Sequence, residues 1–251
     1  MDLEIAGRVA VITGATAGIG RTTAGVLAAE GVRLALVGRR SEELDKLGAE
    51  IVAAGGEEPL LIPADVTDAA TPGRVRAQVE EAFGGLDILV NNAGGAEPLG
   101  TVLTEEVWQQ QFVFNFHQKR WMAEAFEDLL IASPQGRVIN MAVALEPSGR
   151  SAAMSALAAL HLWSKGYARY LGPHSVTVNC VSPGRIESEQ LSKMFPDDES
   201  RNAFIKKSDL PLGRFGFKEE AADLIAFLAS ARSSYITGQA ISIDGGLSRH
   251  I

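Results

Sequence analysis

The sequence predicts an α/β protein built on a parallel sheet that helices cover on both faces. Three observations favour this class. Strand-like and helix-like patterns alternate along nearly the whole chain. A glycine-rich turn, TGATAGIG at 13–20, joins the first predicted strand to the first predicted helix. Polar or glycine-containing loops follow most of the predicted strands, which is where ligands bind in sheets of this kind.

The composition predicts one globular domain over residues 1–251. The chain is 46% hydrophobic, enough for a buried core, and its net charge of −8 argues against a nucleic-acid or anionic-membrane surface. The single cysteine, Cys180, excludes an intramolecular disulfide and suits a reducing compartment. The start, MDLEIAGR, has no signal-peptide pattern, and the longest apolar stretch, around 152–163, is too short to span a bilayer. We therefore expect a cytoplasmic protein, and we expect no metal centre.

The first strand, turn and helix predict an anion-binding site. Residues 9–12 form a short apolar run typical of a buried strand, and the Ala-rich stretch 21–30 is typical of a helix. Gly14, Gly18 and Gly20 lack a Cβ, so the backbone can turn tightly and approach a pyrophosphate. The free N–H groups and dipole of the helix N-terminus favour an anion there. The alternative is an ordinary glycine-rich turn between strand and helix.

The rest of the chain continues this alternation. Further strands are expected at 33–37, 60–62, 87–90, 137–141, 176–181 and 239–243. Helices are expected at 41–55 with Ser41 as its cap, at 71–83, at 104–131 as one long stretch starting at Thr104, within 149–171, and at 218–230. Residues 187–212 are polar, and we expect them to be irregular. Because parallel strands need right-handed crossovers, the loops after the strands should share one rim.

Motifs along the whole chain resemble those of the short-chain dehydrogenase/reductase family. They are TGATAGIG at 13–20, DV at 65–66, NNAG at 91–94, an asparagine at 115, VTVNCVSPG at 176–184, YITGQ at 235–239 and IDGG at 243–246. The resemblance, nearest in general to 3-oxoacyl-carrier-protein reductases, implies a three-layer Rossmann fold with a seven-stranded parallel sheet and a nicotinamide cofactor. It also implies a homodimer or homotetramer through helices at 104–131 and 151–171, and a substrate lid at 186–212, for which an ordered surface loop is the alternative.

The resemblance assigns cofactor contacts to residues at the ends of several strands. Besides Arg39 and Arg40, they are Gly14, Thr16, Ala17, Gly18, Ile19, Gly20, Asp65, Val66, Asn92, Ala93, Gly94, Pro183, Gly184, Ile186 and Ser188. Asp65 and Val66 are expected to hold the adenine. Ile186 and Ser188 are expected to contact the nicotinamide end.

The end of the second strand favours NADP(H) over NAD(H). NAD binders usually place an acid there to accept hydrogen bonds from the ribose 2′-OH. Here Gly38 is followed by Arg39 and Arg40, whose guanidinium groups suit a 2′-phosphate. The alternative is a solvated charge pair at the helix entry. Ala17 weakens the NADP(H) prediction, because related NADP-binding proteins often carry a second basic residue there.

The groups that carry the family's chemistry are missing from their expected positions. The family uses a serine after the fifth strand and a YxxxK pair, whose lysine lowers the pKa of the tyrosine. Two registers place Ala153 and Leu157, or Ala156 and Leu160, at the tyrosine and lysine, and Ala142 or Val143 at the serine. Only Asn115 remains of the usual catalytic residues, so it is the single catalytic residue that we expect; the alternative is that it only caps or kinks its helix. A histidine acid, His161 in HLWSK, is the alternative, but that register removes about two helical turns before VTVN.

Three functions are compatible with this sequence. The first is an NADP(H)-dependent oxidoreductase of carbonyls or alcohols, 3-oxoacyl groups included, that uses an unusual acid or water. The second is a catalytically inactive binding or scaffold subunit, since all three reactive groups are replaced by apolar ones. The third is a different reaction in an apolar pocket, such as a cyclisation or isomerisation.

Overall fold

The computed structural model describes residues 2–97, 100–144 and 149–249. Within them, one parallel sheet has the strand order β3-β2-β1-β4-β5-β6-β7. Its strands are β1 (Val9–Thr13), β2 (Arg33–Gly38), β3 (Leu60–Pro63), β4 (Ile88–Asn91), β5 (Arg137–Met141), β6 (Thr177–Pro183) and β7 (Ala240–Ile243). The predicted fold class, a seven-stranded Rossmann-type sheet between helical layers, is confirmed.

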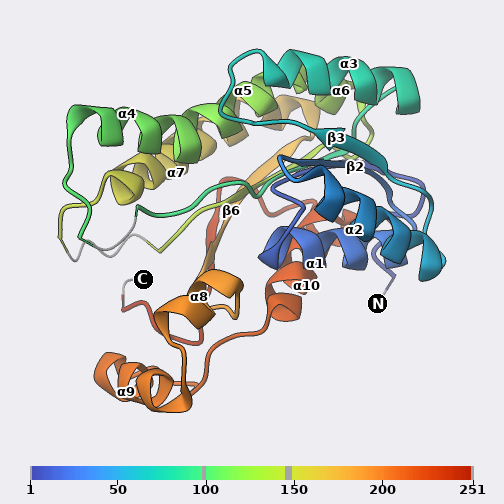
Figure 1. The fold of residues 1–251 in the computed structure, drawn as a ribbon. Helices are drawn as coiled ribbons and strands as arrows, with labels where there is room; N and C mark the ends of the chain where they lie inside the picture. The colour runs from blue at the N-terminus through green and yellow to red at the C-terminus, as the bar shows by residue number, and fades with distance from the viewer. Residues whose placement is uncertain (1, 98–99, 145–148, 250–251) are drawn as a thin grey trace.

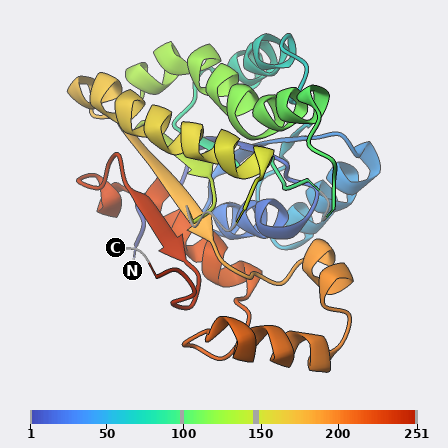
Figure 2. The same ribbon diagram turned by 90° about the vertical axis from the view of Figure 1, so that its left-hand side faces the viewer.

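Helices cover both faces of the sheet (Figure 1). One layer holds α1 (Gly18–Ala29), α2 (Ser41–Ala53) and α10 (Lys218–Ala229). The other holds α3 (Thr71–Phe83), α4 (Glu105–Phe112), α5 (Gln118–Ala125), α6 (Glu127–Ala132) and α7 (Ala152–Leu171). Two further helices, α8 (Glu189–Met194) and α9 (Asp198–Ser208), project beyond the ends of the strands, and α4 and α7 lie side by side in both views (Figure 2). None of the helices in the described residues has the length and apolarity needed to cross a membrane.

The core divides into two layers because successive side chains of a strand point to opposite faces. In β1, Ala10 and Ile12 pack with residues of α1, α2 and α10. Val9 and Val11 pack on the other face with residues of α3, α5 and α7. All five residues of β1 are buried, as expected for a central strand of a sheet that is covered on both sides.

The long helix expected at 104–131 is interrupted. Thr104 caps α4 as predicted, accepting from the Val107 N–H at 3.4 Å. A π-helical turn, Val113–His117, then separates α4 from α5, and Phe126 separates α5 from α6. The π turn widens the helix where the Asn115 amide turns inward to bond the backbone of Gly95. Hydrophobic periodicity does not predict this break, because the residues on both sides of it still favour a helix.

Two further expectations were wrong. Ser41 is the first residue of α2 and does not cap it, since Arg40 occupies the cap position and no side chain bonds there. Residues 187–212 are not irregular, because they contain α8 and α9. Each begins with a side chain that accepts from a backbone N–H: Ser188 from Leu191 at 3.1 Å, and Asp197 from Ser200 at 2.8 Å.

Candidate active site

A pocket of about 670 Å³ lies at the carboxyl ends of the strands, a size typical of small-molecule sites. It lies where the strand order reverses, since β1 has β2 on one side and β4 on the other. Every residue predicted to bind the cofactor lines this pocket except Gly20. Their contact with a cofactor stays a prediction, but the structure brings them together.

The glycine turn after β1 has the shape that an anion site needs. Gly18 begins α1 with φ +54, and a Cβ built on it would meet nothing within 4 Å, so the main chain is open to a ligand. Gly14 has φ +66, and its Cβ would lie 2.9 Å from the Ala93 Cα. The first turn of α1 carries no acidic residue to oppose an anion at the helix N-terminus.

Gly20 is the one residue predicted to contact the cofactor that does not line the pocket. It lies beneath the turn and not in the pocket wall. A Cβ on it would press against the Asn92 amide and lie 2.5 Å from the Gly14 carbonyl oxygen. Gly20 therefore serves close packing, and it lets the Asn92 amide donate to the carbonyl oxygens of Thr13 and Gly14, each at 3.1 Å.

Steric packing explains why no acidic side chain stands at the end of β2. A Cβ on Gly38 would lie 2.6 Å from the Thr16 Cγ2 methyl, so a side chain at this position requires the Thr16 side chain to shift. The Arg40 guanidinium donates to the Thr16 carbonyl oxygen at 3.1 Å. Arg39 extends into solvent with Nη1 4.0 Å from the Asp65 carboxylate, and hydrogen bonds from Thr67 hold the pKa of that carboxyl below its usual range. Two cations therefore flank the β2 end of the pocket.

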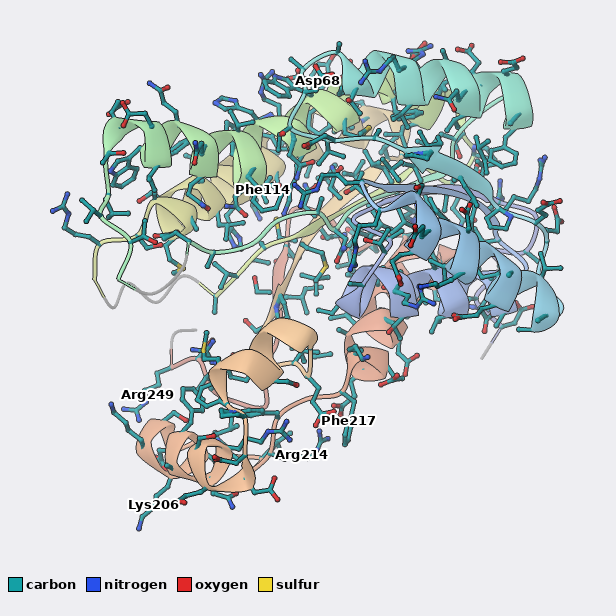
Figure 3. All side chains as sticks on the ribbon, in the orientation of Figure 1. Asp68, Phe114, Lys206, Arg214, Phe217 and Arg249 are labelled. Atoms are coloured by element: carbon teal, nitrogen blue, oxygen red, sulfur yellow. The ribbon has the colours of Figure 1, made fainter. Side chains whose placement is uncertain are left out.

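The opposite end of the pocket is apolar. The β5 end contributes Met141, Ala142 and Val143, and the first turns of α7 contribute Ala153, Met154 and Leu157 among others. Phe114 borders the pocket from the π turn, and Figure 3 shows its position beneath the helices of that layer. None of the described residues that line the pocket is a tyrosine or a histidine.

The three tyrosines lie outside the pocket wall. Tyr167 is buried, donates to one Glu127 carboxylate oxygen at 2.8 Å and stacks on Trp163. Burial and Glu127 raise the pKa of this phenol, so it is a poor proton donor near neutral pH. Tyr170 donates to the other Glu127 oxygen at 3.1 Å, and Tyr235 is fully exposed.

His161, the alternative acid, lies outside the pocket wall. Its Nε2 is 2.9 Å from the Val143 carbonyl oxygen, so the imidazole contacts the loop between β5 and α7. His161 lies outside the wall because Ala153 and Leu157 occupy the turns of α7 nearest the pocket, and His161 comes one helical turn after Leu157.

Asn115, the one predicted catalytic residue, lines the pocket and is almost completely buried. Its oxygen accepts from the Gly95 N–H at 3.0 Å, and its nitrogen donates to the Gly95 carbonyl at 2.9 Å and to Gln111 Oε1 at 2.8 Å. These bonds pin the loop after β4 to the π turn. The structure thus gives Asn115 a positioning role, and its part in catalysis stays a prediction.

Two ionisable residues in the pocket wall, Lys119 and Arg185, were missed from the sequence, and the Arg185 guanidinium packs over the ring of Phe204. Lys119 on α5 is 1% exposed, and its ammonium donates to the Met141 carbonyl oxygen. Burial lowers the pKa of Lys119 to about 8. The available signal was its spacing, because Lys119 shares the inward helix face with the buried Met122 and Phe126.

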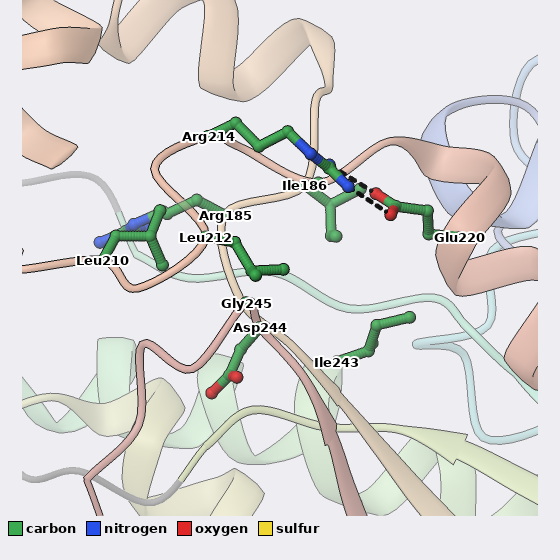
Figure 4. Close-up of a pocket in the computed structure, with 10 residues that line it drawn as sticks. Arg185, Ile186, Leu210, Leu212, Arg214, Glu220, Ile243, Asp244 and Gly245 are labelled. Atoms are coloured by element: carbon green, nitrogen blue, oxygen red, sulfur yellow. Dashed lines mark hydrogen bonds and ion pairs between the residues drawn. The ribbon is translucent and has the colours of Figure 1, made fainter.

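The segment after β6 forms the remaining side. Ser188, Leu191 and Met194 line the large pocket from α8 and its cap residue, and a lid role for this segment stays a prediction. A separate hollow of about 80 Å³ lies between this segment, residues 210–216 and the turn after β7 (Figure 4). The Arg214–Glu220 ion pair, at 2.7 Å, borders it. This small hollow is too small to hold a substrate.

Known proteins share this architecture over their full length. Residues 14–248 match the family described as enoyl-(acyl carrier protein) reductase. The chain is 34% identical over 251 residues to the 3-oxoacyl-[acyl-carrier-protein] reductase FabG of Thermotoga maritima, covering 98% of this chain and 99% of that one. It is 32% identical over 246 residues to galactitol 2-dehydrogenase (L-tagatose-forming) of Cereibacter sphaeroides, covering 96% and 94%. The crystal structure of L-sorbose reductase from Gluconobacter frateurii, complexed with NADPH and L-sorbose, matches with a TM-score of 0.92 and 29% identity over 100% of both chains.

Fold and pocket together define a Rossmann-type α/β protein with a ligand site at the switch point of its sheet. The similarity to these proteins extends over nearly the whole chain and identifies its family. It belongs to the short-chain dehydrogenase/reductase family, as the sequence motifs implied.

Proposed function

We propose that this chain is an NADP(H)-dependent oxidoreductase that reduces a carbonyl group, or oxidises the corresponding alcohol, in an atypical active site. One observation carries the proposal. A single pocket joins a glycine turn at a helix N-terminus, two arginines at the end of β2 and an apolar chamber between β5 and α7. An anionic dinucleotide fits the first two features, and a small organic substrate fits the third.

The residues present fit the cofactor. The open main chain at Gly18 accepts a pyrophosphate, and Arg39 and Arg40 accept a 2′-phosphate. When bound, the nicotinamide supplies the hydride that a carbonyl carbon accepts. The NADPH in the similar L-sorbose reductase structure supports this choice of cofactor. The role of the chain's own residues is to orient the substrate and to exclude water from the apolar chamber.

The active site is atypical because the family's tyrosine and lysine positions fall on apolar residues in either register, on Ala153 and Leu157, which line the chamber, or on Ala156 and Leu160. The serine position falls on Ala142 or Val143, which also line it. These apolar side chains are the observation that favours a scaffold protein as the alternative. The ammonium of Lys119 in the same wall favours an enzyme, since an inert binding surface needs no buried charge.

Two measurements on the purified protein test the proposal. Calorimetric titration should show NADPH binding at least about tenfold more tightly than NADH, a difference of about 1.4 kcal/mol. Absorbance of the reduced nicotinamide, followed at about 340 nm with ketones, sugars, quinones and acyl thioesters, should fall with at least one substrate class. Binding of NADPH without turnover on any of them would favour the scaffold alternative. Binding of neither cofactor would overturn the proposal.

We further propose that the protein is a homodimer or homotetramer through the helices at 104–131 and 151–171. On this surface Leu162 of α7 is 78% exposed, and the rings of Phe116 and Trp163 pack with their centroids 6.3 Å apart. Light scattering should give a mass of two or four times 26.6 kDa. Replacing the exposed leucine with a charge, Leu162→Glu, should lower that mass, whereas a monomeric wild type would contradict the proposal.

A further inference from the structure

Lys119 is a cation buried without a counter-charge. It is 1% exposed, and it forms no ion pair with any of the described residues. Burying an unpaired ammonium opposes folding, whereas a methionine of similar length would fill the same space without that penalty. Packing alone therefore gives no reason for a lysine at this position. Buried groups with perturbed ionisation that border a cleft are typical of functional sites.

The surroundings hold the ammonium at the pocket wall. Its Nζ donates to the carbonyl oxygen of Met141 and lies 3.3 Å from where a Cβ of Gly94 would be. Both Met141 and Gly94 line the pocket, so Nζ lies between two residues of its wall. The backbone is fixed as well, because the Asn91 amide donates to the Lys119 carbonyl oxygen at 3.1 Å and to Asn140 at 2.9 Å.

No other ionisable group is as well placed at the chamber. The tyrosines and His161 lie outside the pocket wall, and Asp65 lies at the β3 end of the pocket. Arg185 also lines the pocket, but a guanidinium does not release a proton near neutral pH. Cys180 on β6 is buried and does not line the pocket. The Lys119 ammonium is therefore the donor that borders the apolar chamber between Met141 and Leu157.

We propose that Lys119 donates the proton to the carbonyl oxygen during reduction, an inference that rests on the proposed function. The carbonyl carbon accepts the hydride, its π electron pair moves to the oxygen, and that oxygen takes one proton from Nζ. The balance is a carbonyl, NADPH and one proton giving an alcohol and NADP⁺. The neutral amine left on Lys119 then regains a proton from water.

The ionisation of Lys119 suits this role. Burial lowers the pKa of Lys119 to about 8, so the ammonium is present at neutral pH and releases its proton more readily than an exposed lysine. The titratable group that acts on it is the Cys180 thiol from β6, whose own pKa burial raises. The groups that approach it from β4, β5 and the π turn are amides and carbonyls, which do not titrate.

The test uses the full-length protein with Lys119→Met and Lys119→Arg. Methionine removes the charge, and arginine keeps a charge but does not release a proton near neutral pH. Both variants should lower the rate of carbonyl reduction by about 100-fold or more, while NADPH affinity measured by calorimetry changes less than about threefold. Lys165→Met is the matched control, since Lys165 also donates to a carbonyl, that of Gly238, but lies outside the pocket. It should leave the rate unchanged.

A second readout needs no cofactor. In ¹³C-lysine NMR of the ligand-free protein, the signal absent from Lys119→Met should titrate near pH 8, and the falling limb of the wild-type rate against pH should share that midpoint. A titration midpoint of about 10.4, the ordinary value for a lysine, would overturn the inference. Wild type and Lys119→Met reducing the carbonyl equally would overturn it while leaving the proposed function intact. A wild type that reduces no carbonyl would overturn the proposed function, and this inference with it.

Discussion

The two halves of the pocket are built in different ways. The half expected to bind the nucleotide, called here the nucleotide half, is formed by Gly14 and residues 16–19, 38–40, 65–66 and 92–94, and is shaped mainly by main chain and by glycines that make close approaches possible. The other half, expected to hold the reacting groups and called the reaction half, is shaped by side chains from the β5 end, the π turn, α5 and α7, namely residues 141–143, Asn115, Lys119, Ala153, Met154 and Leu157. The shape of the nucleotide half is therefore determined by main-chain geometry, whereas a few side chains determine the chemistry of the reaction half.

The strongest way to break the nucleotide half is to add one methyl group at Gly20. In Gly20→Ala the new Cβ would collide with the Asn92 amide and lie 2.5 Å from the Gly14 carbonyl oxygen. We expect the free energy of unfolding to fall by ~3 kcal/mol, together with NADPH affinity, because the glycine turn must shift. Urea denaturation and calorimetry measure the two effects.

Gly25→Ala is the matched control on the same helix. A Cβ there meets nothing within 4 Å, so the substitution should raise the free energy of unfolding by ~1 kcal/mol through helix propensity. Equal destabilisation by both alanines would show that the packing under the turn is not what matters.

In the reaction half, removing a polar group should stabilise the protein. The pKa of Lys119 falls from 10.5 to about 8 on folding, so the unfolded chain binds more protons between those pH values and stability rises with pH there. Lys119→Met should raise the free energy of unfolding near pH 7 by ~2 kcal/mol, after allowing for the lost bond to Met141.

That gain should shrink as the pH rises from about 8 to 10.5, because the wild-type lysine loses its charge in the fold. Urea denaturation of both proteins across this range measures it. A gain independent of pH would mean that Lys119 carries no buried charge.

The smallest of these effects concerns the two arginines. Arg39→Ala and Arg40→Ala should each weaken NADPH binding about tenfold and leave NADH binding within about twofold, since only NADPH carries the 2′-phosphate. The larger effect is expected for Arg40, whose guanidinium Thr16 already orients, whereas Arg39 is exposed. Equal losses for both cofactors would mean that the arginines act on the pyrophosphate or on the fold.

The sequence predicted that the residues of the nucleotide half lie together at one rim, because each of its motifs is local. A strand, a glycine turn and a helix are contiguous, and the loops after parallel strands must share one rim. It did not predict that Gly20 lies below the pocket, since this depends on how closely the Asn92 amide approaches from a distant loop. The Lys119 ammonium was missed for a similar reason: its helix face becomes decisive only when α5 packs on the ends of β4 and β5.

The methyl group of Thr16 over Gly38 makes cofactor choice depend on two positions at once. An aspartate introduced by Gly38→Asp meets that methyl, so by itself it displaces the Thr16 side chain and, with it, a contact that holds Arg40. Pairing it with Thr16→Ala opens the space, although it also removes the hydroxyl that helps hold Arg40. The effect of an acid at position 38 on cofactor choice therefore depends on the residue at position 16, a case of epistasis between neighbouring strand ends.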